Sequence, residues 1–189
     1  MSLAVLETAR LRLRQFADDD AAFVLELLNE PAWLRFIGDR GVRTLDDARA
    51  YIESGPRAMF ARHGFSLMVA ERATDGAALG MCGLIKRDTL PAPDIGYAFL
   101  PRYWGQGYAR EAVTLLLRYY FRELRFQKVT ILIYSFNARS IRFHERFGFT
   151  ESGVLRRVGW KHDAWHDVAY LQRDLGDPDA PAGPLQARV

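Results

Sequence analysis

The sequence has 189 residues, of which 49% are hydrophobic and 26% are charged, a balance typical of one folded domain. Its formal net charge of +3 is too small and too scattered to predict a nucleic-acid surface. No apolar run approaches the roughly 20 residues of a membrane-spanning helix, the N-terminus does not resemble a signal peptide, and the single cysteine, Cys82, allows no intramolecular disulfide. We therefore expect a cytoplasmic protein that binds neither nucleic acid nor membrane.

The chain opens with a strand and a helix. Residues 8–15 alternate apolar and polar side chains, which predicts a half-buried strand. Three aspartates at 18–20 then precede a helix over residues 21–28, where acidic residues suit the positive end of the helix. Pro31 is expected to end this helix, and an aromatic-rich connector follows it.

A capping box predicts where the next helix begins. Thr44 with Asp47 three residues later fits that pattern, with an acid in place of the usual Glu. The helix should run to about residue 53, because Gly55-Pro56 is expected to break or kink it.

The rest of the chain predicts six further strands and two further helices. In chain order they are strands at 65–71, 79–86 and 94–100, a helix at 107–126, a strand at 129–134, a helix at 138–147, and strands at 150–160 and 165–174. The tail from Gly176, rich in Pro and Ala, predicts disorder. We find no repeat and no linker, so we expect a single domain over residues 1–175 and a disordered tail over 176–189.

The most informative segment is Tyr103-Trp104-Gly105-Gln106-Gly107-Tyr108-Ala109-Arg110, which follows a predicted strand and enters the long helix. Its glycines allow a tight turn and leave several N–H groups without partners at a helix N-terminus, where positive partial charge binds phosphate. The segment therefore predicts a ligand that contains a pyrophosphate. Taken alone, it also fits a glycine-rich helix entry that binds nothing.

Two other nucleotide-binding turns fit less well. A dinucleotide-binding turn has Gly or Ala where Arg110 stands. It also has an acidic residue about 20 residues later, whereas residues 128–136 contain no Asp or Glu. The Gly-Lys-Ser/Thr sequence of a P-loop is missing too.

The turn is similar instead to the acetyl-CoA site of the GNAT superfamily of N-acetyltransferases, whose fingerprint is Gln/Arg-x-x-Gly-x-Gly/Ala. Here Trp104-x-x-Gly107-x-Ala109 matches the last two anchors and departs from the first. The departure removes one side-chain contact and leaves the backbone N–H groups that hold the pyrophosphate in this superfamily.

Other segments resemble the same superfamily, in the right order, over about residues 6 to 175. One resembles the second GNAT motif, and another resembles the strand that hydrogen-bonds the pantetheine arm. The opening and the close of the chain look like the RimJ/RimL-type branch, whose members acetylate ribosomal-protein N-termini. The second GNAT motif corresponds to Asn137–Arg142 with Glu145–Phe149, and the pantetheine strand corresponds to Asp94–Tyr97. The opening of the chain is Leu6–Arg14, and its close is Glu151–Arg156 with His166–Tyr170.

The resemblance implies an α+β fold: a mixed, mostly antiparallel central sheet with a splayed parallel pair of strands and helices on both faces. It implies acetyl-CoA as co-substrate and direct acetyl transfer to a primary amine by a monomer or homodimer, with no acyl-enzyme. The residues it places at the cofactor are Tyr97, Ala98, Phe99, Gln106, Gly107, Tyr108, Ala109, Arg110, Asn137, Arg139 and Ser140.

The resemblance also suggests the catalytic groups. A backbone N–H close to Tyr97 or Ala98 would stabilise the oxyanion. His144 stands where many relatives have a Tyr, and an imidazole titrating near 6.5 could protonate the departing thiolate. The alternative is a partly buried helix histidine without catalytic duty.

The general base is less well defined by the sequence. Some relatives use a Glu at the position that Leu132 occupies here. Asp94 is the nearest acid in its strand and could act through water, or it is a solvated carboxylate at a strand edge, or no protein base is needed.

Several other residues have a structural and a functional interpretation. Gly96 marks either a bulge or close packing, and Trp33 and Phe36 either line the acceptor site or pack in the core. Cys82 is expected to be a core residue. His162 and His166 are spaced like a zinc pair but fall in predicted strands, so we expect no metal unless a turn at 163–164 brings them together.

Three functions remain open. The first is acetylation of a protein N-terminus, and the second is the same chemistry on a small amine such as an aminoglycoside, a polyamine or an amino acid. Residues 30–43 hold two acids against three arginines, which disfavours a polycation. The third is a CoA-binding sensor without catalysis.

Overall fold

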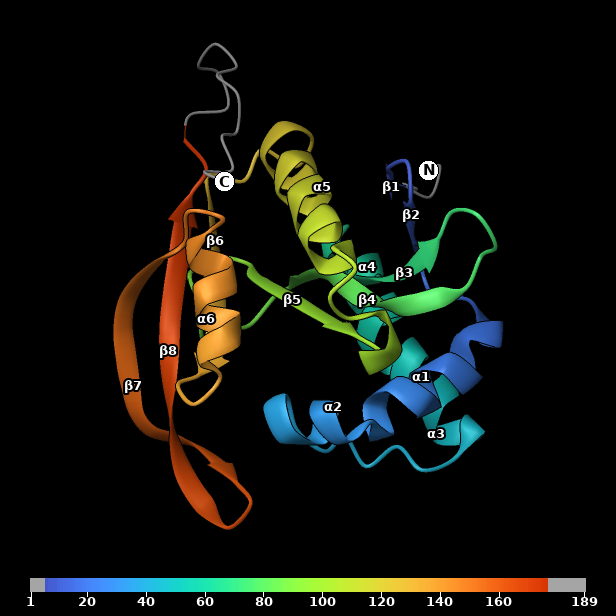
Figure 1. Cartoon of the computed structure of the whole chain (residues 1–189), viewed down its shortest axis with the longest axis horizontal. Helices are drawn as coiled ribbons and strands as arrows, with labels where there is room; N and C mark the ends of the chain where they lie inside the picture. Colours follow the sequence, from blue (N-terminus) through green and yellow to red (C-terminus); the bar gives the residue numbers. More distant parts are fainter. Residues whose placement is uncertain (1–5, 177–189) are drawn as a thin grey trace. The chain divides into compact units, whose positions relative to one another are not determined.

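A computed structural model of the chain describes residues 6–176. Within them, eight strands hydrogen-bond in the order β1-β2-β3-β4-β5-β6-β8-β7 (Figure 1). β5 and β6 run parallel, with Asp94 opposite Thr130, whereas β1–β2, β2–β3, β3–β4, β6–β8 and β7–β8 are antiparallel. This mixed sheet with its helices confirms the predicted α+β class.

The described residues form two compact units. Residues 6–86 and 95–117 make up the first, and residues 87–94 and 118–176 make up the second. The single domain over 1–175 stays a prediction, and the predicted tail falls almost wholly in 177–189, outside the described residues.

The first unit contains strands β1 to β4, nearly all of β5, and the helices around them. Its elements are β1 (Leu6–Glu7), β2 (Leu11–Arg14), η1 (Asp18–Asp20), α1 (Ala21–Asn29), α2 (Pro31–Phe36), α3 (Leu45–Ile52), η2 (Glu53–Arg57), α4 (Ala58–His63), β3 (Leu67–Arg72), β4 (Ala78–Ile85), β5 (Asp94–Phe99), η3 (Pro101–Tyr103) and the first ten residues of α5 (Tyr108–Arg122). None of the helices within residues 6–176 is long and apolar enough to cross a bilayer.

Both faces of β3 and β4 are buried. Successive strand residues point to opposite faces, and Met68, Val69 and Ala70 are all at most 6% exposed. One face packs against the first three helices, through a cluster of buried residues that comprises Phe16, Ala21, Val24, Leu27, Leu28, Trp33, Val42, Ala48, Ile52, Val69, Met81 and Leu100. Leu11 and Leu13 of β2 are fully buried, as the alternating pattern predicts.

One local prediction is confirmed and two need correction. Thr44 Oγ1 accepts from the Asp47 N–H at 3.1 Å and Asp47 accepts in return, so the capping box is confirmed. The aromatic connector is itself a helix, because Pro31 occupies an N-terminal position, where its fixed φ suits a new helix. Gly55-Pro56 does not break the chain of helices, since a five-residue π-helical segment absorbs the missing N–H and joins α3 to α4.

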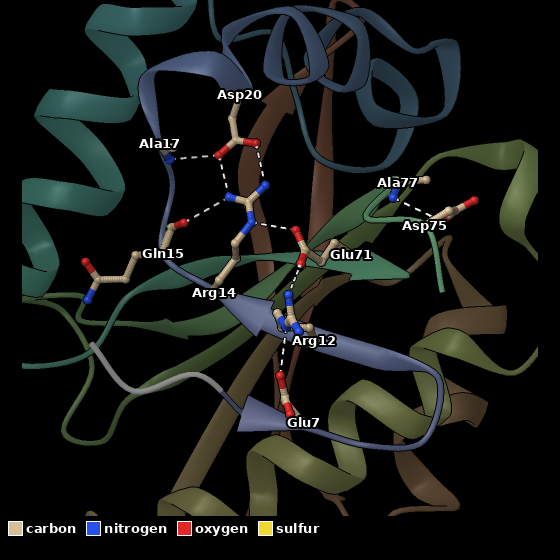
Figure 2. Close-up of polar contacts among 9 residues, drawn as sticks. All are labelled: Glu7, Arg12, Arg14, Gln15, Ala17, Asp20, Glu71, Asp75 and Ala77. Atoms are coloured by element: carbon tan, nitrogen blue, oxygen red, sulfur yellow. Dashed lines mark hydrogen bonds and ion pairs between the residues drawn. The ribbon is translucent and has the colours of Figure 1, made fainter. Parts of the chain in front are cut away.

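A ladder of alternating charges ties β2 to β3 and to η1. It runs Glu7–Arg12–Glu71–Arg14–Asp20, and Figure 2 shows each carboxylate facing a guanidinium. Arg14 is its centre: its Nη1 and Nη2 bond Asp20 at 2.7 and 2.9 Å, and its Nε bonds Glu71 at 2.6 Å. Both carboxylates are buried (6% exposed); Asp20 depends on Arg14 for its countercharge, whereas Glu71 shares Arg14 with a longer contact to Arg12 at 3.3 Å.

The second unit is built on three antiparallel strands and one helix: β6 (Lys128–Tyr134), α6 (Ala138–Glu145), β7 (Thr150–Lys161) and β8 (Ala164–Asp174). β8 pairs with β6 from Lys128 opposite Asp174 to Tyr134 opposite Val168. β7 and β8 form a long hairpin, drawn in orange and red in Figure 1. Its two-residue turn, His162-Asp163, has φ of 48° and 55°, the left-handed values of a type I′ hairpin turn.

We predict that Arg14→Ala destabilises the protein by about 3 kcal/mol, because it leaves buried Asp20 without a countercharge and buried Glu71 with Arg12 alone. Urea unfolding measures the loss. Arg49→Ala serves as control, since the Arg49–Asp46 pair is exposed (53% and 91%), and such pairs contribute about 0.5 kcal/mol or less. Equal losses in the two variants would contradict this account of the ladder.

Candidate functional site

The glycine-rich turn lies in the first unit, between η3 and α5. Gly105 and Gly107 have φ of 76° and 85°, so both use the left-handed conformation that favours glycine. Trp104 stands at the first anchor of the motif, and its indole N–H donates to the Phe99 carbonyl at 2.7 Å. The residue that departs from the fingerprint therefore fixes the turn to the end of β5.

The N-terminus of α5 presents backbone N–H groups beyond this turn. The Glu111 N–H bonds back to the Gly107 carbonyl at 3.1 Å, so the N–H groups of Tyr108, Ala109 and Arg110 precede the helical ladder. Gly105, Gln106 and Gly107 are exposed. An exposed turn before a helix start suits a phosphate-bearing ligand, and the cofactor role of residues 106–110 stays a prediction.

A second layer of contacts behind the turn involves residues that the sequence analysis did not assign to the site. Arg10 donates from Nε to Glu111 Oε2 at 2.7 Å and from Nη1 to the Gln106 carbonyl at 3.1 Å. Thr8 Oγ1 also bonds the Glu111 carboxylate. The available signal was the resemblance of residues 6–14 to the opening of the RimJ/RimL-type branch, which contains both Thr8 and Arg10.

The three predicted cofactor residues of β5 differ in exposure. Tyr97 and Ala98 are half-buried, and Phe99 is buried (7% exposed), with its carbonyl used by Trp104. A Cβ on Gly96 would lie 2.9 Å from Ile85 Cδ1, which supports the interpretation of Gly96 as a packing glycine.

The predicted cofactor residues of the second unit lie at the start of α6. Asn137 is the N-cap, and its Oδ1 accepts from the Ser140 N–H at 3.2 Å. The Ser140 carbonyl lies 2.8 Å from Nδ1 of His144, and Arg139 is exposed. Asn137 and Ser140 therefore shape the start of the helix, and Arg139 is the cation there that faces solvent.

His144 is buried in α6 rather than poised to titrate near 6.5. Its ring packs edge-on against Phe143 and Phe149, with centroids 5.3 Å away in each case, and the residue is 0% exposed. Burial lowers the pKa of His144 to about 4, so the ring is neutral at pH 7. In that state Nδ1 is the protonated nitrogen, because it faces the Ser140 carbonyl. Burial therefore corrects the expectation that His144 titrates near 6.5. The catalytic role of His144 stays a prediction.

Asp94 is not the solvated strand-edge carboxylate that was one expectation. It is 2% exposed, and its Oδ2 accepts from Arg87 Nε at 2.5 Å. Burial raises the pKa of Asp94, although Arg87 and the Leu132 backbone N–H oppose the shift. Oδ1 is buried and has no hydrogen-bond partner among the described residues.

The other candidates differ in burial and contacts. The Trp33 indole donates to the Gly38 carbonyl at 2.8 Å, and the ring belongs to the buried cluster, whereas Phe36 is half-buried. Cys82 is fully buried, and its burial raises the thiol pKa. His166 Nε2 lies 3.0 Å from the Lys161 carbonyl. Across residues 6–176, no three His, Cys, Asp or Glu side chains group to hold a metal ion.

The fold and the turn define a class: an α+β protein whose glycine-rich strand-to-helix turn suits a phosphate-bearing ligand. Residues 10–150 match the acetyltransferase (GNAT) domain, so the chain belongs to this family and is an acetyltransferase. Members of the family use acetyl-CoA. The resemblance found in the sequence is thereby confirmed at the level of the superfamily.

A relative is similar to this chain in sequence, and two solved structures share its fold. The chain is 35% identical to the uncharacterized protein YkkB of Bacillus subtilis (strain 168) over 155 residues, which cover 80% of this chain and 88% of YkkB. The ribosomal L7/L12 alpha-N-protein acetyltransferase RimL, solved with coenzyme A, shares the fold with a TM-score of 0.79 at 19% identity, over 90% of this chain and 98% of RimL. A spermidine N-acetyltransferase SpeG chimera from Vibrio cholerae and hSSAT gives a TM-score of 0.75 at 21% identity, over 88% and 96%.

We predict that Gly107→Ala weakens CoA binding about tenfold, because its φ disfavours a side chain and its new Cβ would lie 3.3 Å from Arg10 Nη2. Isothermal titration calorimetry measures the dissociation constant. Gly41→Ala is the control: its φ is 70°, and no atom lies within 4 Å of the added Cβ. Both variants should lose similar stability, and a similar loss of CoA affinity in Gly41→Ala would refute the prediction.

We predict that His144 makes the fold sensitive to acid. The unfolded histidine binds a proton as the pH falls below about 6.5, whereas the folded one resists protonation down to about 4. Unfolding is therefore favoured increasingly over that range, and the cost approaches about 3 kcal/mol at pH 4. Urea unfolding of the parent and of His144→Phe at pH 7, 5.5 and 4 measures the difference. Parallel stability curves for the two proteins would show that the histidine keeps its ordinary pKa when folded.

Proposed function

We propose that this acetyltransferase uses acetyl-CoA to acetylate a primary amine directly, with a protein N-terminal α-amine as the first candidate acceptor. The observation that carries the proposal is the turn Gly105–Gly107, which opens onto the free N–H groups of α5. We assign the diphosphate of the cofactor to these groups, because they supply positive partial charge without a lysine.

The remaining cofactor contacts are proposed residue by residue. The backbone of β5 at Tyr97 and Ala98 is assigned to the acetyl and pantetheine portion, and its N–H groups are candidates for the oxyanion. Asn137, Arg139 and Ser140 are assigned to the cofactor by their place in the second GNAT motif. Acetyl-CoA supplies the thioester. The chain itself has to bind and orient the two substrates and to transfer one proton.

Asp94 and His144 are the proposed proton carriers, in modified roles. The raised pKa of Asp94 brings a carboxylate closer to the range of an effective base, and Oδ1 is its free acceptor atom. His144 at neutral pH has its proton on Nδ1, which leaves Nε2 as an acceptor rather than as the acid expected from a pKa near 6.5.

An α-amine demands the least of these groups. Its pKa near 8 leaves a substantial neutral fraction at pH 7, whereas a lysine amine near 10.4 has to lose its proton to a base. The segment 30–43 offers little negative charge to a polycation, because one of its two acids, Asp39, is paired with Arg43 at 2.5 Å. The resemblance of the opening and the close of the chain to the RimJ/RimL-type branch supports the same acceptor, and a small amine is the second candidate.

The experiment that tests the proposal measures thiol release from acetyl-CoA with a panel of acceptors. The panel contains peptides with free N-termini, the same peptides with acetylated N-termini and a free lysine, and spermidine. Rapid release with free N-termini alone, with the product identified by mass spectrometry, is the expected result. Thiol release with spermidine alone would contradict a protein N-terminus as the acceptor and favour a small amine. CoA binding without release on any amine would indicate a sensor and overturn the enzymatic proposal.

A further inference from the structure

We propose that Arg10 is a positioning residue for the cofactor turn, which keeps the N-terminus of α5 electropositive by neutralising Glu111; this inference rests on the proposed function. The residue lies in the link between β1 and β2, far from the turn in sequence. Neither the family fingerprint nor the second motif includes it.

Arg10 holds two parts of the turn at once. Its Nε and Nη2 contact Glu111 Oε2 at 2.7 and 2.5 Å, and its Nη1 donates to the Gln106 carbonyl at 3.1 Å. The guanidinium also lies 5.0 Å from the centre of the Tyr108 ring. One side chain thus bonds the residue before Gly107 and the first turn of the helix, which fixes the direction in which the helix starts.

Glu111 is the reason that this position needs a cation. A carboxylate in the first helical turn stabilises a helix, but the same negative charge repels a phosphate that binds the neighbouring N–H groups. Burial would raise the pKa of Glu111, yet hydrogen bonds from Thr8 and Arg10 outweigh it and lower the pKa, so the acid is ionised. Arg10 cancels that charge where the ligand would meet it.

The close fit of Gly107 supports the same role. A Cβ at this residue would lie 3.3 Å from Arg10 Nη2, so the guanidinium packs directly against the glycine of the turn. Half of the Arg10 side chain remains exposed, and its three polar contacts are all to the turn or to α5. The contacts therefore point to positioning of the turn rather than to a buried structural ion pair.

The test compares Arg10→Ala, Arg10→Lys and the double variant Arg10→Ala/Glu111→Gln. Each is measured for its CoA dissociation constant and for kcat and KM with two donors, acetyl-CoA and S-acetylpantetheine, which lacks the diphosphate. Arg12→Ala is the matched control, because Arg12 lies on the neighbouring strand, is equally exposed (47%) and pairs with Glu7 and Glu71 instead. Thermal melting of every variant checks that it is folded.

Arg10→Ala is expected to raise the CoA dissociation constant and the KM for acetyl-CoA about tenfold, with kcat and the kinetics of S-acetylpantetheine nearly unchanged. The double variant should recover at least half of the loss on a logarithmic scale, and Arg10→Lys part of it. Arg12→Ala should match the parent.

Three results would overturn the inference: no change in Arg10→Ala, an equal loss with both donors, or no recovery in the double variant. The last would mean that Arg10 contacts the ligand directly rather than acting through Glu111. These outcomes are distinct from failure of the proposed function, in which the parent protein itself would neither bind CoA nor release thiol.

Discussion

The first unit is organised around one constraint: an α-helix leaves its first N–H groups without partners, and these groups need an acceptor. At α5 they are left exposed, while the structure around them is fixed. Trp104 ties the turn to the end of β5, and Arg10 ties it to Glu111 and Gln106. A helix start that is rigid and also unsatisfied is the arrangement that an anionic ligand can complete without reorganising the protein.

Local chemistry explains which elements could be predicted from the sequence. The capping box at Thr44 and the hairpin of β7 and β8 depend on neighbouring residues, and both are confirmed. The segment at Pro56 shows the limit of local reasoning. A proline removes one hydrogen bond, and the chain accommodates that loss in a π-helical segment rather than by ending the helix.

The candidate site also contains features that local sequence predicts and features that it does not. Glycines at 105 and 107 predict a left-handed turn before a helix from sequence alone, because few other residues adopt that conformation cheaply. The contact of Arg10 with Glu111 joins residues 101 positions apart, so no spacing rule could find it. The states of His144 and Asp94 depend on burial, which a single sequence does not determine.

Burial shifts the pKa values of these two groups in opposite directions but with one consequence. The pKa of the histidine falls and that of the aspartate rises, and in both cases the neutral form is favoured. Desolvation makes the histidine a weaker base than an ordinary imidazole, and a weak base is a poor partner for an amine that holds its proton tightly. An amine that is already partly neutral at physiological pH makes the smallest demand on them, and an α-amine meets that condition better than a lysine. The burial of these two groups is therefore consistent with the proposed α-amine acceptor.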